Sequence, residues 1–272
     1  MVTETDVEVS LVVVDASLRE DDDETSLPVD YLNDTDRIGL SDVRYFVESL
    51  QRERFWALVH AERHLAWRLA GPSKRWELMR FTPVEEVPAL SGSEMVDCQP
   101  LNAGGPWVKL PESMVQRIGN ETDVVIRLGF GLIKGAVLEA TEYGVLSFHP
   151  SDIRKYRGLS ISQAFINDDD ELGITLQQLA PKIDGGRIVA FKTVDISDSH
   201  TLDNVYGRLM EGQISMLADG VRNLKDPAFT PEVPSDLPEY VSISKRKELK
   251  FASRVVAKNV AGRVKRQMRS RL

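Results

Sequence analysis

Short apolar runs rich in β-branched residues recur along the chain between polar segments. The first, Val7–Val14, reads VEVSLVVV and is nearly continuous, which is typical of a strand buried on both faces. Further strands are predicted at Glu77–Phe81, Met95–Cys98, Asp123–Leu128, Gly144–Phe148, Gly173–Leu179 and Arg187–Val194.

Segments with helical spacing of apolar residues lie between these runs. One predicted helix begins at Ser41 or Asp42 and continues to about Ala70, before Gly71-Pro72. Others are predicted at Pro111–Gly119, Ala136–Thr141, Ser162–Ile166 and Leu202–Leu224, the last capped by Thr201. Because strands alternate with helices, we predict an α/β fold with a mostly parallel sheet.

Charge is distributed unevenly over the 272 residues. The chain carries 34 basic and 42 acidic side chains, a formal net charge of −8. Residues 241–272 hold eleven basic side chains and one acidic one, Glu248, so this segment is +10 and the preceding 240 residues are −18. An acidic body repels nucleic acid, which argues against DNA as a partner and disfavours tRNA.

The C-terminal segment has a pattern of its own. Four prolines in Asp226–Pro238 indicate a linker, which we place at 226–240. In the basic tail, residues 241–272, apolar side chains recur at four- and five-residue steps from Phe251 to Met268, which predicts an amphipathic helix. We expect this helix to pack on the acidic body, and contact with an anionic surface is the alternative.

Several classes of site and location are excluded or disfavoured. Cys98 is the one cysteine, so neither an internal disulfide nor a multi-cysteine zinc site can form. His60 and His64 lie four apart on a predicted helix with no carboxylate or cysteine cluster nearby, so we predict a surface or core pair and no metal. The absence of a long apolar run and the acidic N-terminus favour a cytoplasmic protein.

Two polar segments follow predicted strands and are candidates for chemistry. Ser147 and His149 end one strand, and Asp184 lies in a glycine turn after another. A histidine at a strand's carboxyl end is well placed for proton transfer, and the aspartate could orient it. The alternative is a packed loop histidine and a turn-forming aspartate. A Ser-His-Asp hydrolase triad is disfavoured, because no Gly-x-Ser-x-Gly elbow surrounds Ser147.

The segments GVLSFHPSDIRKYRG and DDDELGITLQQLAPKIDGGRIV resemble the formyltransferase family. The family signature is a strand that ends in Asn-x-His-Pro-Ser, followed by an aromatic-basic-Gly step, Glu-Thr-Gly-Val-Thr and an Asp-x-Gly turn. The matching residues are His149-Pro150-Ser151, Tyr156-Arg157-Gly158, Glu171 with Gly173-Ile174-Thr175, and Asp184-Gly185-Gly186. The likeness covers about residues 121–225.

This resemblance implies a Rossmann-like, doubly wound domain over residues 1–225. It also implies transfer of a formyl group from 10-formyltetrahydrofolate to the amine of a small molecule, such as an amino-sugar nucleotide. His149 would be the acid and oxyanion donor, and Asp184 would hold it and help take the amine proton. The implied donor pocket is Phe130, Gly131, Leu132, Ile133, Leu179, Lys182 and Ile183. The residues implied to lie near the substrate are Ser151, Tyr156, Arg157, Gly158 and Thr175.

The sequence departs from the family pattern in ways that keep other functions open. Ser147 stands where the family has asparagine, and a hydroxyl is shorter than an amide. Hydrolysis of 10-formyltetrahydrofolate and a catalytically weak binding protein are therefore the alternatives. The acidic loop Asp21–Glu24 disfavours a ribonucleotide substrate, because it would repel phosphate. Residues 18–120 carry no recognisable family motif, and no oligomeric state is predicted.

Overall fold

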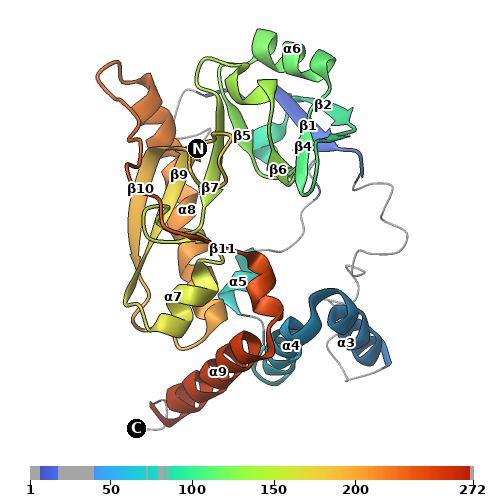
Figure 1. Cartoon of the computed structure of the whole chain (residues 1–272), viewed down its shortest axis with the longest axis vertical. Helices are drawn as coiled ribbons and strands as arrows, with labels where there is room; N and C mark the ends of the chain where they lie inside the picture. The colour runs from blue at the N-terminus through green and yellow to red at the C-terminus, as the bar shows by residue number, and fades with distance from the viewer. Residues whose placement is uncertain (1–6, 18–39, 72, 79–82, 84–85, 270–272) are drawn as a thin grey trace.

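The computed structural model of the chain describes residues 7–17, 40–71, 73–78, 83 and 86–269. The acidic loop Asp21–Glu24 lies outside these residues. The largest sheet has four strands in the order β10-β9-β7-β5 (Figure 1). These strands are β5 (Val125–Arg127), β7 (Val145–His149), β9 (Glu171–Gln178) and β10 (Arg187–Asp195).

The predicted α/β class is confirmed, and the main sheet is mixed. β5 and β7 pair in parallel, whereas β9 pairs antiparallel with both β7 and β10. β9 and β10 are joined by a short turn that includes Lys182–Gly186, which is too short for the crossover that parallel neighbours require. Sequence pattern located both strands, but the length of their connection decides their direction.

Smaller sheets complete the strand pairing in the described part of the chain. β1 (Leu11–Asp15) pairs in parallel with β2 (Glu94–Cys98), which supports the strands predicted near these positions. β3 (Leu101–Asn102), β4 (Trp107–Lys109) and β6 (Leu132–Ile133) form a three-stranded sheet. β8 (Arg157–Gly158) pairs with β11 (Tyr240–Val241).

Two hydrophobic cores lie on opposite faces of the main sheet. Successive residues of a strand point to opposite faces, so Val145 and Leu146 of β7 belong to different cores. The Leu146 core is shared with α7 (Ile161–Asn167) and α8 (Leu202–Lys225). The Val145 core is shared with α6 (Glu112–Glu121) and the 3₁₀ helix η5 (Ala136–Glu139).

α8 packs closely against the sheet at two residues that lack side chains. A Cβ atom at Gly212 would meet Ile174 Cδ1 at 2.7 Å, and one at Gly220 would overlap Leu176 Cδ2. Thr201 caps the helix, since its hydroxyl accepts a hydrogen bond from the Asn204 amide at 3.2 Å. This cap is the one that the sequence predicts.

Two predictions for the N-terminal half need correction. The helix expected from Ser41 or Asp42 to Ala70 is broken into α3 (Leu40–Glu53), η2 (Arg54–Trp56) and α4 (Ala57–Ala70), because Arg54 adopts a left-handed backbone with φ of 51°. The prediction of a strand at Glu77–Phe81 is wrong for the residues of this range that the structure describes. Lys74–Leu78 forms helix α5, which packs against α8, and residues 79–82 lie outside the described part. Strong helix formers and this tertiary contact outweigh the apolar run.

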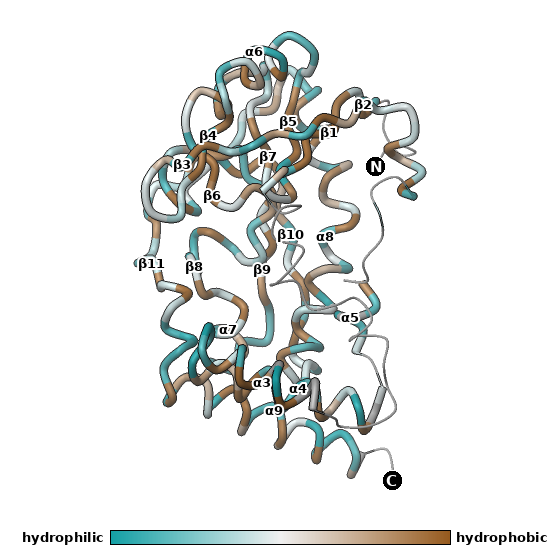
Figure 2. Tube along the Cα trace, turned by 90° about the vertical axis from the view of Figure 1, so that its right-hand side faces the viewer, coloured by the Kyte–Doolittle hydropathy of each residue, from teal (hydrophilic) through white to brown (hydrophobic). Residues whose placement is uncertain are grey.

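The C-terminal helix α9 (Leu249–Arg269) packs against α4 and α7 at the end of the molecule opposite α6 (Figure 2). Phe251 and Val255 are buried, and the Phe251 ring lies 6.3 Å from that of Trp56. Lys258 forms an ion pair with Asp168 at 2.5 Å, and Arg263 pairs with Glu62 at 2.9 Å. Apolar packing and charge pairing therefore both hold this basic helix on the body.

The proline-rich segment that precedes α9 also contacts the main sheet. Glu232 bridges to Ile188 of β10, and the Pro238 carbonyl accepts a hydrogen bond from Arg157 at 3.0 Å. Two further 3₁₀ helices are η4 (Pro88–Leu90) and η6 (Ile243–Lys247). Among the described residues, no helix is both long enough and apolar enough to cross a membrane.

The packing of α9 predicts a large effect of Phe251→Ala on stability. Removing a buried aromatic ring leaves a cavity, so the free energy of unfolding should fall by about 3 kcal/mol in urea titrations. Phe251 is 8% exposed, whereas Val264 on the same helix is 49% exposed. Val264→Ala should therefore change stability by less than about 0.5 kcal/mol. Equal effects of the two variants would contradict the observed docking.

Candidate active site

A row of three polar side chains crosses the main sheet near the carboxyl end of β7. In the strand register, Arg127 of β5 lies beside Ser147 of β7, and Ser147 lies beside Gln177 of β9. Neighbours in register point to the same face, so the three side chains share one side of the sheet. Arg127 Nη1 donates a hydrogen bond to Ser147 Oγ at 2.8 Å, and Arg127 Nη2 donates to the Gly131 carbonyl.

His149 and Asp184 form a hydrogen-bonded pair next to this row. His149 Nδ1 lies 3.1 Å from Asp184 Oδ1, and the two side chains are 6% and 17% exposed. On its other side, His149 Nε2 lies 2.7 Å from the Ser151 hydroxyl and 3.1 Å from the Tyr156 carbonyl. Both ring nitrogens are therefore engaged with named partners, which fixes the orientation of the imidazole.

Asp184 is held as a carboxylate by its surroundings. Burial by itself raises the pKa of Asp184, but the hydrogen bond and charge of His149, the Gly158 amide at 2.9 Å and the charge of Arg157 outweigh it. The net result is a pKa below the ordinary value of 3.8. Asp184 is thus ionised at neutral pH and accepts hydrogen bonds through both oxygens.

Backbone geometry explains the residues around Asp184. Asp184 itself has a left-handed φ of 47°, which aspartate adopts more readily than most residues. The Gly186 amide donates to Gln177 Oε1 at 3.1 Å, and a Cβ atom at Gly186 would overlap the Gln178 carbonyl. Gly158, with φ of 75°, leaves no space for a Cβ beside the Val241 carbonyl. Two of the motif glycines are therefore required by close backbone approach.

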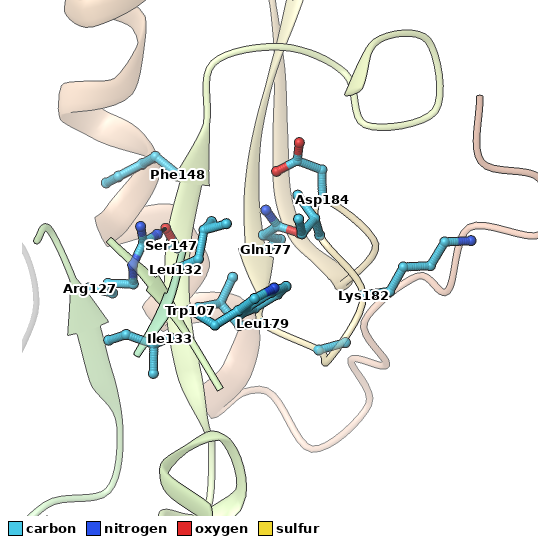
Figure 3. A pocket seen from close by; sticks show the side chains of 12 residues that line it. Trp107, Arg127, Leu132, Ile133, Ser147, Phe148, Gln177, Leu179, Lys182 and Asp184 are labelled. Atoms are coloured by element: carbon cyan, nitrogen blue, oxygen red, sulfur yellow. Dashed lines mark hydrogen bonds between the residues drawn. The ribbon is translucent and has the colours of Figure 1, made fainter. Parts of the chain in front are cut away.

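A cavity of about 190 Å³ brings these groups to a common space. In the view of Figure 3, Ser147 lies beside Arg127, and Asp184 lies across from them with Gln177 between. Trp107, Leu132 and apolar neighbours supply the rest of the wall. The full lining is Trp107, Arg127, Leu132, Ile133, Ser147, Phe148, Gln177, Leu179, Ala180, Lys182, Ile183 and Asp184.

The structure brings together part of the residue set predicted from the sequence. Seven of those residues line the cavity: Leu132, Ile133, Ser147, Leu179, Lys182, Ile183 and Asp184. Phe130 and Gly131 directly precede β6, to which Leu132 belongs, but they are not part of the lining. His149 does not line the cavity either, but it is hydrogen-bonded to Asp184, which does.

The remaining predicted residues support the pair from behind. Ser151 bonds to His149, and Thr175 Oγ1 donates to the Ser151 carbonyl at 2.8 Å. Tyr156 turns its hydroxyl to Asp169 at 2.7 Å, and Arg157 donates to the Ile183 carbonyl at 2.5 Å. These side chains brace the strand ends and the Asp184 turn, and they are not part of the cavity wall.

Sequence reasoning missed Trp107, Arg127 and Gln177. Arg127 lay inside a predicted strand and Gln177 inside another, where side chains are read as scaffold. An arginine in the apolar run DVVIRL is the one signal that could have been noticed, since a charge in a buried strand needs a reason. In the part of the chain that the structure describes, no group of three or more His, Cys, Asp or Glu side chains is placed to hold a metal.

Comparison with known proteins shows which family part of the chain resembles. Residues 110–221 match the family model described as formyl transferase. This match confirms the resemblance that the motifs predict, and the matched residues include the cavity residues from Arg127 to Asp184.

Curated relatives match over part of their length. The methionyl-tRNA formyltransferase of Halalkalibacterium halodurans is 35% identical over 100 residues, which are 36% of this chain and 32% of the relative. That of Agathobacter rectalis is 26% identical over 198 residues, 70% of this chain and 61% of the relative. The chain thus spans from about a third to three fifths of the length of these relatives.

Solved structures align loosely. A sugar N-formyltransferase from a Shewanella species is 18% identical, with a TM-score of 0.45, over 66% of this chain and 72% of that one. HypX from Aquifex aeolicus, in complex with tetrahydrofolic acid, is 16% identical, with a TM-score of 0.37, over 56% of this chain and 25% of that one.

The lowered pKa of Asp184 predicts how Asp184→Asn changes stability with pH. A carboxylate with a depressed pKa in the folded state stabilises the fold above its unfolded pKa, and that contribution is lost as pH falls through the folded pKa. The variant should therefore be less stable than the natural protein at pH 6, and the difference should shrink as pH falls below about 4.

Denaturant unfolding at a series of pH values from 6 to 3 measures this difference. Asp198→Asn is the matched control, because Asp198 is an exposed carboxylate outside the site. It should show no comparable pH-dependent difference. A gap between Asp184→Asn and the natural protein that stays constant over this range would contradict the assigned charge state.

Proposed function

We propose that this chain is a folate-dependent N-formyltransferase, which moves the formyl group of 10-formyltetrahydrofolate to the amine of a small molecule. The observation that carries the proposal is a cavity with an ionised carboxylate on one wall and hydrogen-bond donors on another. An amine that attacks a formyl carbon needs both, since it sheds a proton while the carbonyl oxygen gains charge. The family match over residues 110–221 supports the same reaction class.

The proposed reaction has two steps. The amine nitrogen attacks the formyl carbon, a C–N bond forms, and the carbonyl electron pair moves to the oxygen. Asp184 takes the proton that the attacking nitrogen loses. The oxyanion then collapses, the bond from carbon to N10 of the folate breaks, and N10 receives the proton from Asp184. The products are a formamide and tetrahydrofolate, so atoms and charge balance.

The geometry supports different roles for His149 and Asp184 from those that the resemblance implies. Asp184 lies on the cavity wall, whereas His149 is held behind it by Ser151 and Tyr156. We therefore assign proton transfer at the substrate to Asp184. His149 is a positioning residue, which orients the carboxylate through Nδ1 and shares the proton while the intermediate exists.

The cavity volume limits how much of the donor it can enclose. At about 190 Å³, the space is smaller than pockets that hold a whole drug-sized ligand, which begin at about 300 Å³. We propose that Trp107, Leu132 and Leu179 surround the pterin end and the formyl group. The rest of the folate donor and the acceptor then lie outside the cavity. We place this reaction in the cytoplasm.

We infer a small-molecule acceptor such as an amino-sugar nucleotide. The strongly negative body disfavours tRNA, whereas the curated relatives are methionyl-tRNA formyltransferases. Both acceptors therefore belong in one experiment. Consumption of 10-formyltetrahydrofolate should be followed spectroscopically with amino-sugar nucleotides, with methionyl-tRNA and with water alone.

This acceptor assay separates the candidate functions. Consumption that depends on a small amine supports the proposal, and dependence on methionyl-tRNA would overturn the acceptor class. Equal consumption without any amine would identify a hydrolase. Binding of tetrahydrofolate with no consumption in any arm would identify a binding protein and overturn the proposed activity.

The proposed proton transfer predicts a loss of turnover in Asp184→Asn. A positioned acid–base group contributes about 100- to 10,000-fold, so kcat for formyl transfer should fall by at least about 100-fold. His149→Ala should lower kcat as well, because it releases the carboxylate from its orientation. Asp198→Asn should keep full activity. Unchanged kcat in either site variant would remove that residue from the mechanism.

A further inference from the structure

Arg127 presents an unusual set of contacts for a cation in a strand. Its two hydrogen bonds go to the Ser147 hydroxyl and the Gly131 carbonyl, and neither partner carries a charge. Its buried Nε has no partner among the described residues. A guanidinium has five N–H groups, so these two bonds leave donor capacity in a cavity-lining side chain.

The contacts between Arg127 and Ser147 give the pair a fixed direction. Ser147 Oγ accepts from Arg127 Nη1, so the hydroxyl hydrogen of Ser147 is free to donate elsewhere. Gln177, the next member of the row, is anchored by the Gly186 amide. Burial lowers the pKa of Arg127, and the charge of Asp184 opposes this effect. The cation thus faces a carboxylate across the cavity and has an uncharged partner beside it.

We propose that Arg127 is a catalytic residue which, together with the Ser147 hydroxyl, forms the oxyanion-binding site of this cavity. This inference rests on the proposed formyl transfer and deepens it. The formyl oxygen becomes negative when the nucleophile attacks, and a cationic N–H and a neutral O–H from adjacent strands then stabilise it. Donors fixed before the reaction are effective because they need no rearrangement as the charge appears.

The pair also accounts for the serine at position 147. An amide at this position would extend farther into the cavity than the shorter hydroxyl does. Arg127 is the register neighbour of Ser147, and its side chain is long enough to supply a donor from β5. The donor function is therefore divided between two strands.

The decisive variants are Arg127→Met, Arg127→Lys and the double variant Arg127→Met/Ser147→Asn. Arg127→Met keeps side-chain length and removes the donors, so kcat should fall about 100-fold. Arg127→Lys keeps the charge but loses the planar fork, so the loss should be smaller. The amide added in the double variant should raise kcat at least tenfold above that of Arg127→Met. Arg187→Met removes an exposed cation of β10 and should keep full activity.

Two further measurements accompany kcat. Far-UV circular dichroism and thermal unfolding verify that each variant folds. Calorimetric titration with tetrahydrofolate, which lacks the formyl oxygen, should give a Kd within about threefold of that of the natural protein. An unchanged kcat in Arg127→Met overturns the inference. A Kd raised more than tenfold with unchanged kcat would show that Arg127 binds the folate and does not act in catalysis. That outcome would overturn the inference as well.

The same assay distinguishes failure of this inference from failure of the proposed function. If the natural protein only hydrolyses 10-formyltetrahydrofolate, the proposed transfer is wrong, but water attack forms the same oxyanion. Loss of hydrolysis in Arg127→Met would then still support the role of Arg127. A natural protein that neither transfers nor hydrolyses the formyl group would overturn both proposals.

Discussion

The hydrogen bond between His149 and Asp184 is the constraint around which the site is arranged. It joins the carboxyl end of β7 to the turn that follows β9, and each partner is held by further bonds. Burial alone would favour a neutral Asp184, yet these contacts keep it ionised. The fold thus maintains a charged group at a half-buried position, where its proton affinity depends on its neighbours.

Gly158, Gly186 and Arg157 help to hold the His149–Asp184 pair in place. Gly158 and Gly186 allow backbone amides to approach acceptors at distances that a side chain would prevent. Arg157 fixes the Asp184 turn by donating to the Ile183 and Pro238 carbonyls. Several motif residues therefore hold the strand ends and the Asp184 turn in place, and only some of them face the cavity.

Opposite Asp184, the cross-strand row supplies positive charge and hydrogen-bond donors. This polarity suits a reaction in which a proton leaves on one side while negative charge develops on the other. The basic helix α9 packs on α4 and α7, and its ion pairs are with Asp168 and Glu62. The basic end of the chain is thus a helix that pairs with acidic side chains of the body.

Sequence by itself determined the α/β class, most strands of the main sheet, the α8 cap and the candidate pair His149 and Asp184. These follow from local apolar patterns, capping chemistry and ordered motifs, which depend on neighbours in sequence. Tertiary structure decided which residues face the cavity. Arg127, Ser147 and Gln177 are distant in sequence and meet only because the strand register aligns them. It also decided that α5 is helical and that His149 stands behind Asp184, because these depend on packing between separate elements.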